Sequence, residues 1–223
     1  MVAQRLSVVI PALNEARGIR AALEALAPLR ARGHELIVAD GGSSDATAQL
    51  AGELADRVLQ TPRGRAVQMN GAASVATGDY LCFLHADTRL PPGADELVAA
   101  SLKTHLWGRF DVEIEGRHRL LKVVAGAMNL RSRLTGIATG DQAIFVRRAA
   151  FPGFPEIALM EDVAFCRRMK RLGPPACRRE TVVTSGRRWE SRGVLRTVLL
   201  MWRLRLMYFL GADPEDLSRI YYR

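Results

Sequence analysis

The sequence predicts an α/β fold: a doubly wound, mainly parallel sheet flanked by helices. Three observations support this prediction. Short β-branched segments alternate with helical segments through the first half of the chain. Three of those segments end in polar loops, as strands of a parallel sheet do above a ligand site. The chain has 223 residues, of which 48% are apolar, enough for one domain with a full core.

The first predicted strand is Leu6–Ile10, a short apolar run that we expect Pro11 to end. A helix is expected from Glu15 to about Leu29, because its apolar residues recur at helical spacing. Strand and helix together form the first half of a βαβ unit.

The second strand is predicted at Leu36–Ala39, followed by the loop "DGGSSD". Ser43 or Ser44 is expected to cap the next helix, since serine hydroxyls accept hydrogen bonds from free backbone N–H groups. A brief third strand is expected at Val58–Leu59.

A helix of small residues is predicted from Ala66 to Ala76, and the fourth strand at Tyr80–Leu84. The pair Pro91-Pro92 is expected to open a helix over Gly93–Leu102. The first half of the chain therefore resembles a nucleotide-binding unit, although it has neither of the usual glycine-rich phosphate motifs.

The second half has a different pattern. In Arg109–Glu115 apolar and charged residues alternate, which predicts a half-exposed strand of the antiparallel kind. The remaining expected elements are a basic helix over Arg117–Leu134, a strand at Ala143–Val146, and helices over Met160–Leu172, over Val194–Leu210 and from Asp213 onward. No linker is visible, so we expect one domain over 1–223.

Composition limits the class of partner. The formal net charge of +9 suits an anionic partner. The three cysteines are far apart, without metal-ligand spacing, which predicts reduced thiols and a cytoplasmic protein. Aromatic residues make up 6% and do not interleave with the basic clusters, which argues against nucleic acid. Neither a signal peptide nor a membrane-spanning helix is expected.

Carboxylates follow two of the strands. Asp40 comes after the second strand and Asp87 after the fourth, so both are expected at one edge of the sheet. A divalent cation that holds a diphosphate would explain two converging acids, because Mg²⁺ and Mn²⁺ take carboxylate and phosphate oxygens. The alternative is that each aspartate only shapes a turn or cap.

Two further clusters are candidates for chemistry. Arg63 and Arg65 lie just before a predicted helix, where guanidinium groups and free backbone N–H groups together suit an anion. The alternative is that both arginines are simply solvated. Glu161 and Asp162 begin another helix, and one of them could act as a general base. Favourable placement near the helix dipole is the structural alternative for both acids.

With these motifs in order, the sequence resembles the family 2 glycosyltransferases, which have the glycosyltransferase-A fold. The landmarks are "VVIPALNE", "VADGGSSDAT", "GRAVQMNGA…ATGDYLCFLHAD" and "MEDVAFCRRM". The resemblance covers roughly residues 6 to 189. It implies a nucleotide-sugar-binding half (1–105) and an acceptor and catalytic half (106–192), followed by C-terminal helices (193–223). It is greatest to a short bacterial branch with "FLHADT" and "GDQAIFVRR", the radical-SAM/selenodomain-associated or arsenosugar-biosynthesis glycosyltransferases.

The resemblance implies a role for each matching position. Asp87 would bind Mg²⁺ or Mn²⁺, and Asp162 would be the catalytic base with Glu161 beside it. The donor nucleotide would contact Pro11, Ala12, Glu15, Asp40, Arg65, His85 and Ala86. The acceptor side would contain Gly140, Asp141, Gln142, Arg188 and Trp189.

The implied reaction is metal-dependent, inverting transfer of a sugar from a nucleoside diphosphate donor, with UDP favoured, to a lipid-linked or small acceptor. Alternatives are a nucleotidyltransferase of similar fold and a basic protein that binds nucleic acid or a membrane surface without catalysis. His85 replaces the first acid of the usual motif, and could contact ribose or phosphate, bind the metal, or merely turn the chain.

The helix over 194–210 also has alternative interpretations. It could pack on the domain, pair with a second subunit, or lie at the inner face of a membrane. The second and third alternatives would add a homodimer or a peripheral membrane contact.

Overall fold

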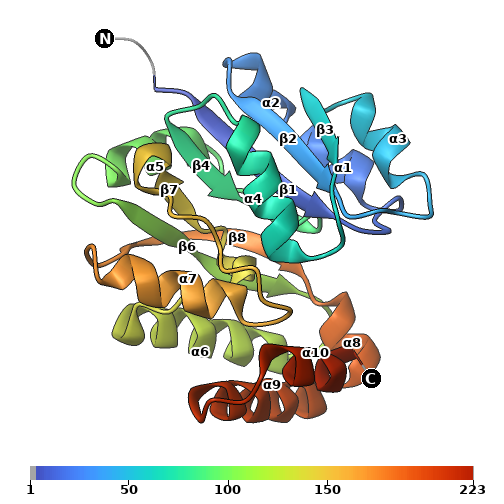
Figure 1. Ribbon diagram of the computed structural model, residues 1–223, viewed down its shortest axis with the longest axis vertical. Coiled ribbons are helices and arrows are strands. Elements are labelled where there is room, and N and C mark those ends of the chain that lie inside the picture. The colour runs from blue at the N-terminus through green and yellow to red at the C-terminus, as the bar shows by residue number, and fades with distance from the viewer. Residues whose placement is uncertain (1–3, 223) are drawn as a thin grey trace.

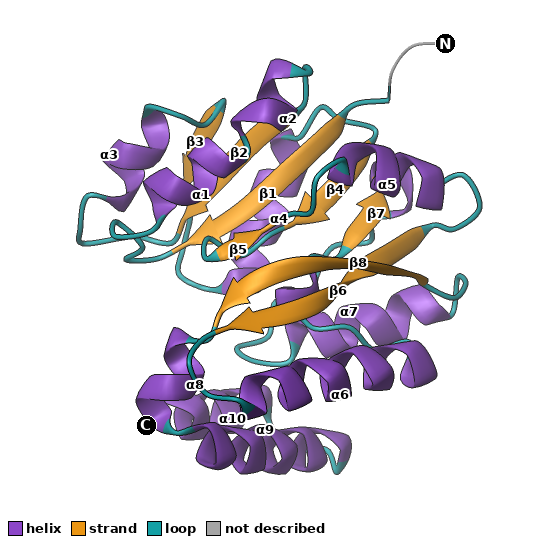
Figure 2. Cartoon of the chain, turned by 180° about the vertical axis from the view of Figure 1, so that it is seen from behind, coloured by secondary structure: helices purple, strands orange, loops and turns teal. Residues whose placement is uncertain are grey.

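The computed structural model describes residues 4–222 and contains one eight-stranded sheet with helices on both faces (Figures 1 and 2). The strands are β1 (Leu6–Ala12), β2 (Glu35–Asp40), β3 (Arg57–Gln60), β4 (Tyr80–Phe83), β5 (Thr88–Arg89), β6 (Trp107–Glu115), β7 (Phe145–Arg147) and β8 (Ala176–Ser185). The α-helices are α1 (Ile19–Ala25), α2 (Ala27–Ala31), α3 (Thr47–Gly52), α4 (Arg65–Val75), α5 (Ala94–Ser101), α6 (Leu120–Thr135), α7 (Glu161–Lys170), α8 (Arg187–Arg192), α9 (Val194–Phe209) and α10 (Pro214–Tyr222).

The strand order is β3-β2-β1-β4-β7-β6-β8-β5. The first four strands in this order are parallel, which confirms the predicted doubly wound half. The short strand β7 is antiparallel to both of its neighbours, β4 and β6, and β8 is parallel to β6. The result is the predicted mixed, mainly parallel sheet, and it runs through both halves of the chain.

Side chains of β1 alternate between the two faces of the sheet, as a strand buried on both sides requires. Ile10 packs in one apolar cluster with Ile19 of α1, whereas Val9 packs in the other with Met69 of α4. Because β1 and β4 are parallel neighbours in this three-layer arrangement, their carboxyl ends lie at the same edge of the sheet.

Three local predictions in the first half are wrong. Strand β1 continues through Pro11 to Ala12. The helix expected over 15–29 is divided at Leu26, because Pro28 has no N–H with which to continue α1. Neither Ser43 nor Ser44 caps α3, which has Ala46 at its N-cap and no side-chain cap.

The strand expected at Arg109–Glu115 also differs from its prediction. Within these residues the strand pairs in parallel with β8, and the antiparallel pairing to β7 is limited to Trp107 and Gly108 just before them. Arg109 is fully buried and forms an ion pair with Asp111. The alternation predicted a half-exposed strand, and this holds only for the second half of β6.

The C-terminal helices pack on the domain. Leu204 of α9 and Leu217 of α10 are buried against Val163 of α7. The opposite face of α9 is exposed and apolar, so the prediction that this helix packs on the domain is confirmed for one face only. Within residues 4–222 we find no helix that combines the length and the apolar character needed to cross a bilayer.

Candidate active site

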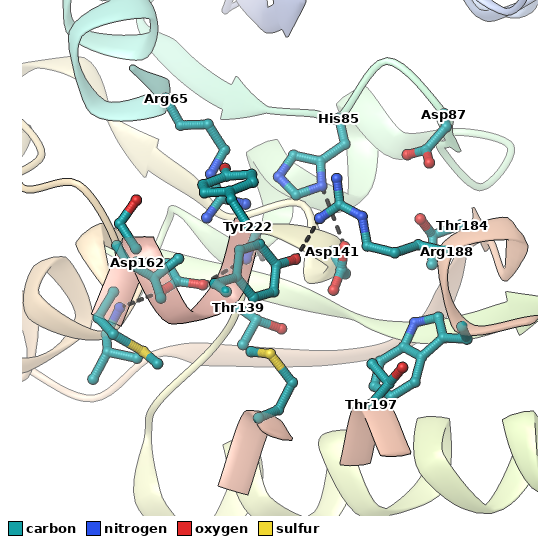
Figure 3. Close-up of a pocket in the computed structure, with 18 of the residues that line it drawn as sticks. Arg65, His85, Asp87, Thr139, Asp141, Asp162, Thr184, Arg188, Thr197 and Tyr222 are labelled. Carbon is teal, nitrogen blue, oxygen red and sulfur yellow. Dashed lines mark hydrogen bonds and ion pairs between the residues drawn. The ribbon is translucent and has the colours of Figure 1, made fainter. Parts of the chain in front are cut away.

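A cavity of about 1430 Å³ lies at the carboxyl ends of β1 and β4 and extends to α6 and α9 (Figure 3). Twelve of the predicted site residues line it: Pro11, Ala12, Glu15, Arg65, His85, Ala86, Asp87, Gly140, Asp141, Asp162, Arg188 and Trp189. Figure 3 shows Asp87 and Asp162 at opposite sides of the view, with His85 and Asp141 between them. Three predicted residues do not line the cavity, namely Asp40, Gln142 and Glu161.

His85 follows β4 and pairs with Asp141, whose Oδ1 lies 3.2 Å from His85 Nδ1. Burial disfavours the charged imidazole, but the hydrogen bond and charge of Asp141 outweigh it, so the pKa of His85 is raised. The pKa of Asp141 is lowered, because the same pairing overcomes the effect of burial. His85 therefore has a definite partner within the cavity and does more than turn the chain.

The short helix Gly140–Gln142 connects His85 to Asp162. The Gly140 N–H donates to Asp162 Oδ2 at 3.1 Å, and the Val163 N–H donates to Oδ1 at 2.7 Å. A Cβ atom at position 140 would collide with the His85 ring, so this close approach requires glycine. Two backbone donors thus fix the orientation of the Asp162 carboxylate.

Glu161 does not line the cavity but pairs with Arg65, which does. It is 3% exposed, and its Oε1 lies 2.8 Å from Arg65 Nε. Burial raises the pKa of Glu161 against the opposing effect of Arg65. The pKa of Arg65 is raised, because Glu161 and Asp162 outweigh the burial that disfavours its charge. Met160, just before these acids, has a left-handed backbone (φ 70°), which is strained for a residue with a side chain.

Asp40 ends β2, where its carboxylate is used by its own loop. Oδ2 accepts the N–H groups of Gly42 and Ser43 at 3.1 and 3.0 Å, and Oδ1 accepts the Ser43 hydroxyl. The side-chain amide of Gln68 in α4 links the ends of β1 and β2, because it donates hydrogen bonds to the carbonyls of Ala12 and Ala39. The structure thus supports the turn-shaping alternative for Asp40, and its implied role in reading the base stays a prediction.

Asp87 is different, because its half-buried carboxylate lines the cavity without a cationic partner among the side chains of residues 4–222. In that same range no three His, Cys, Asp or Glu side chains form a ready-made metal cluster. One carboxylate is nevertheless sufficient for Mg²⁺ or Mn²⁺ when phosphate oxygens and water supply the other ligands. The site fits a metal that arrives with a diphosphate.

On the predicted acceptor side, Gln142 is fully buried, and its amide donates to Ser132 Oγ at 3.0 Å. It shapes the short helix rather than the cavity. Arg188 is exposed at the cavity wall and hydrogen-bonds the Tyr221 hydroxyl, while Trp189 packs against the core.

The sequence analysis missed several residues of the cavity wall, among them Thr139, Arg131, Arg205, Tyr221 and Tyr222. They belong to the second half of the chain, which has few motifs. The one available signal was the position of Arg205, which lies almost opposite Arg196 and Arg203 on its helix. In the structure Arg196 and Arg203 are exposed, whereas Arg205 is partly buried.

Comparison with known proteins identifies the family of the chain. The model of glycosyl transferase family 2 matches residues 7–148, more than half of the chain. The chain therefore belongs to glycosyl transferase family 2, as predicted, and the match favours this class over the nucleotidyltransferase and non-catalytic alternatives. The narrower bacterial branch stays a prediction.

Among curated proteins, the chain is similar to the "PGL/p-HBAD biosynthesis glycosyltransferase" of Mycobacterium bovis and of Mycobacterium tuberculosis. Each is 37% identical over 165 residues, which cover 68% of this chain. The chain spans 62% of the length of these relatives.

Solved structures share the fold. Glucosyl-3-phosphoglycerate synthase from Mycobacterium tuberculosis, in complex with phosphoglyceric acid, has a TM-score of 0.60 at 22% identity and covers 81% of this chain and 71% of its own. TarS 1-349 from S. aureus, in complex with UDP-GlcNAc, has a TM-score of 0.62 at 19% identity and covers 81% and 58%. These similarities confirm the glycosyltransferase-A type of fold.

Proposed function

We propose that the protein is a metal-dependent, inverting glycosyltransferase that uses a nucleoside diphosphate sugar, with UDP favoured. The observation that carries this proposal is the convergence of Asp87, His85, Arg65 and Asp162 on one cavity. Family membership supports sugar transfer. Fold relatives include glucosyl-3-phosphoglycerate synthase crystallised with Mn²⁺ and UDP-glucose, and TarS crystallised with UDP-GlcNAc, which supports a UDP-linked donor.

The donor would lie along the carboxyl edge of β1 and β4. Pro11, Ala12 and Glu15 would line the nucleoside side, and Arg65 would face the diphosphate. Asp87 is the residue that would hold the metal. A bound Mg²⁺ or Mn²⁺ would offset the negative charge that builds up on the leaving diphosphate.

Asp162 is the proposed general base. Its carboxylate is oriented by the N–H groups of Gly140 and Val163, and it faces the cavity. The acceptor oxygen would form a bond to the anomeric carbon while the bond from that carbon to the diphosphate oxygen breaks. The acceptor proton passes to Asp162, and attack opposite the leaving group inverts the anomeric configuration.

The test of the donor chemistry is calorimetry with UDP-glucose and UDP-GlcNAc, with and without Mn²⁺. We expect binding that requires Mn²⁺ and is abolished by EDTA. Asp87→Ala should abolish this metal-dependent binding, whereas Glu24→Gln, on the exposed face of α1, should bind the donor like the wild type. Equal donor binding by Asp87→Ala would contradict the assignment of the metal ligand.

We also propose that the face formed by α6 and α9 contacts an anionic membrane surface. The two helices contain no Asp or Glu. Their exposed apolar side chains are Val123, Leu130, Leu134, Leu195, Leu199, Trp202, Leu206 and Phe209, and exposed basic residues accompany them. An apolar face with basic neighbours suits anionic headgroups.

A further inference from the structure

Among the residues that the structure describes, two arginines on the wall of the cavity have no carboxylate partner. Arg131 of α6 and Arg205 of α9 both line it, on two helices that pack against each other. Within residues 4–222, Nε and Nη2 of Arg131 are buried and make no hydrogen bond. Neither arginine forms an ion pair with a carboxylate in that range, in contrast to Arg65. A buried guanidinium donor without an acceptor is costly, which indicates that a ligand supplies one.

Electrostatics points the same way. Burial, followed by the charge of Arg205, lowers the pKa of Arg131 to about 10. Burial also lowers the pKa of Arg205. The carboxylates of Asp162 and Asp141 act to raise the pKa of both arginines, but they offset the lowering only in part. The pair is therefore a concentrated positive charge that a bound anion would stabilise.

The position of the pair relative to the proposed base defines its role. The negative charge of Asp162 favours the charged form of Arg65 and also that of Arg131, and so acts to raise the pKa of each. Arg65 comes from α4 on the donor side, whereas Arg131 and Arg205 come from helices of the second half. Asp162 thus lies near both cationic groups.

We propose that Arg131 and Arg205 bind an anionic group of the acceptor, a phosphate or carboxylate, and so direct its reacting hydroxyl toward Asp162. The inference rests on the proposed glycosyltransferase function. It deepens that function by assigning the acceptor a negative charge. Because the nearby wall includes Val123, Val198 and Trp202, a phosphate could come from a soluble ester or from a lipid headgroup.

The test uses the full chain with two phosphate probes. One is glycerol 3-phosphate in solution, and the other is a phosphatidylcholine vesicle that contains phosphatidic acid. Arg131→Gln and Arg205→Gln should each weaken binding of at least one probe at least about tenfold, because charge-assisted hydrogen bonds are lost. The probe that responds identifies the source of the phosphate. Arg167→Gln, exposed on α7, is the control and should bind both probes like the wild type.

Donor binding and folding are measured in parallel. UDP-glucose affinity in Mn²⁺ should change less than about twofold in the Gln variants, which separates this subsite from the donor site. Arg131→Lys and Arg205→Lys retain the charge and should lose less probe affinity. Thermal unfolding should show no loss of stability in Arg131→Gln, because two of the Arg131 nitrogens have no hydrogen-bond partner in the described part of the chain.

Three results would overturn the inference. The wild type could bind neither probe, both Gln variants could bind the probes unchanged, or donor affinity could fall together with probe affinity. A wild type that binds glycerol 3-phosphate but not UDP-glucose would instead contradict the proposed donor chemistry, while retaining the anion subsite.

Discussion

At the scale of single residues, the contact between Gly140 and His85 determines how the site is assembled. Gly140→Ala should force the His85 ring away from its position and disrupt its pairing with Asp141. Overpacking of this kind costs about 1–3 kcal/mol of stability. Thermal unfolding should therefore show a lower Tm, and calorimetry should show weaker donor binding.

A matched glycine is available as the control for this prediction. Gly126 lies within α6, and a Cβ there would meet nothing within 4 Å. Gly126→Ala should raise stability by about 0.5–1 kcal/mol, because alanine is the better helix former. An unchanged Tm in Gly140→Ala would show that the His85 ring moves without cost.

The two neighbouring acids should respond differently to loss of charge. Asp162→Asn should reduce turnover about 10²-fold or more, since a positioned base typically contributes that much, while donor affinity and Tm stay near wild type. Glu161→Gln should instead lower Tm, because Arg65 loses its buried partner. The measurements are UDP release with an acceptor that the wild type uses, donor calorimetry and thermal unfolding. Near-normal turnover in Asp162→Asn would exclude it as the base.

At the scale of elements, Asp95 links the first turn of α5 to the segment before β2. Its Oδ1 and Oδ2 accept from Arg32 at 2.8 and 2.9 Å, and Oδ2 lies 2.8 Å from His34 Nε2. Burial opposes ionisation, but these hydrogen bonds outweigh it and lower the pKa of Asp95 to about 2.

A lowered pKa stabilises the folded state above the ordinary value of 3.8, and this contribution is lost as pH falls toward about 2. The shift corresponds to about 2 kcal/mol. Urea unfolding of the wild type and of Asp95→Asn should therefore differ by about this amount near pH 6 and converge near pH 2. A difference that does not change with pH would contradict this account.

The elements also show what the sequence can predict. Strands β1, β2 and β4 were predicted because they are apolar on both faces, and the polar loops predicted after β1 and β4 line the cavity. Strand β8 was missed because Arg178, Arg179 and Glu180 interrupt its apolar pattern. Arg131 and Arg205 were not predicted as site residues because only the packing of α6 and α9 brings them to the cavity, and no local motif records that packing.

At the scale of the whole molecule, the positive net charge and the apolar face of α6 and α9 together predict binding to anionic lipid vesicles. Flotation with vesicles that contain anionic phosphatidylglycerol should recover the protein in the lipid fraction, and recovery should fall as salt is raised. Leu199→Glu and Trp202→Glu should abolish flotation, because each places a negative charge on that face. Leu172→Glu, at another exposed leucine just after α7, should float like the wild type. If the protein stays out of the lipid fraction and light scattering shows a dimer that Trp202→Glu dissociates, the face is a subunit interface instead.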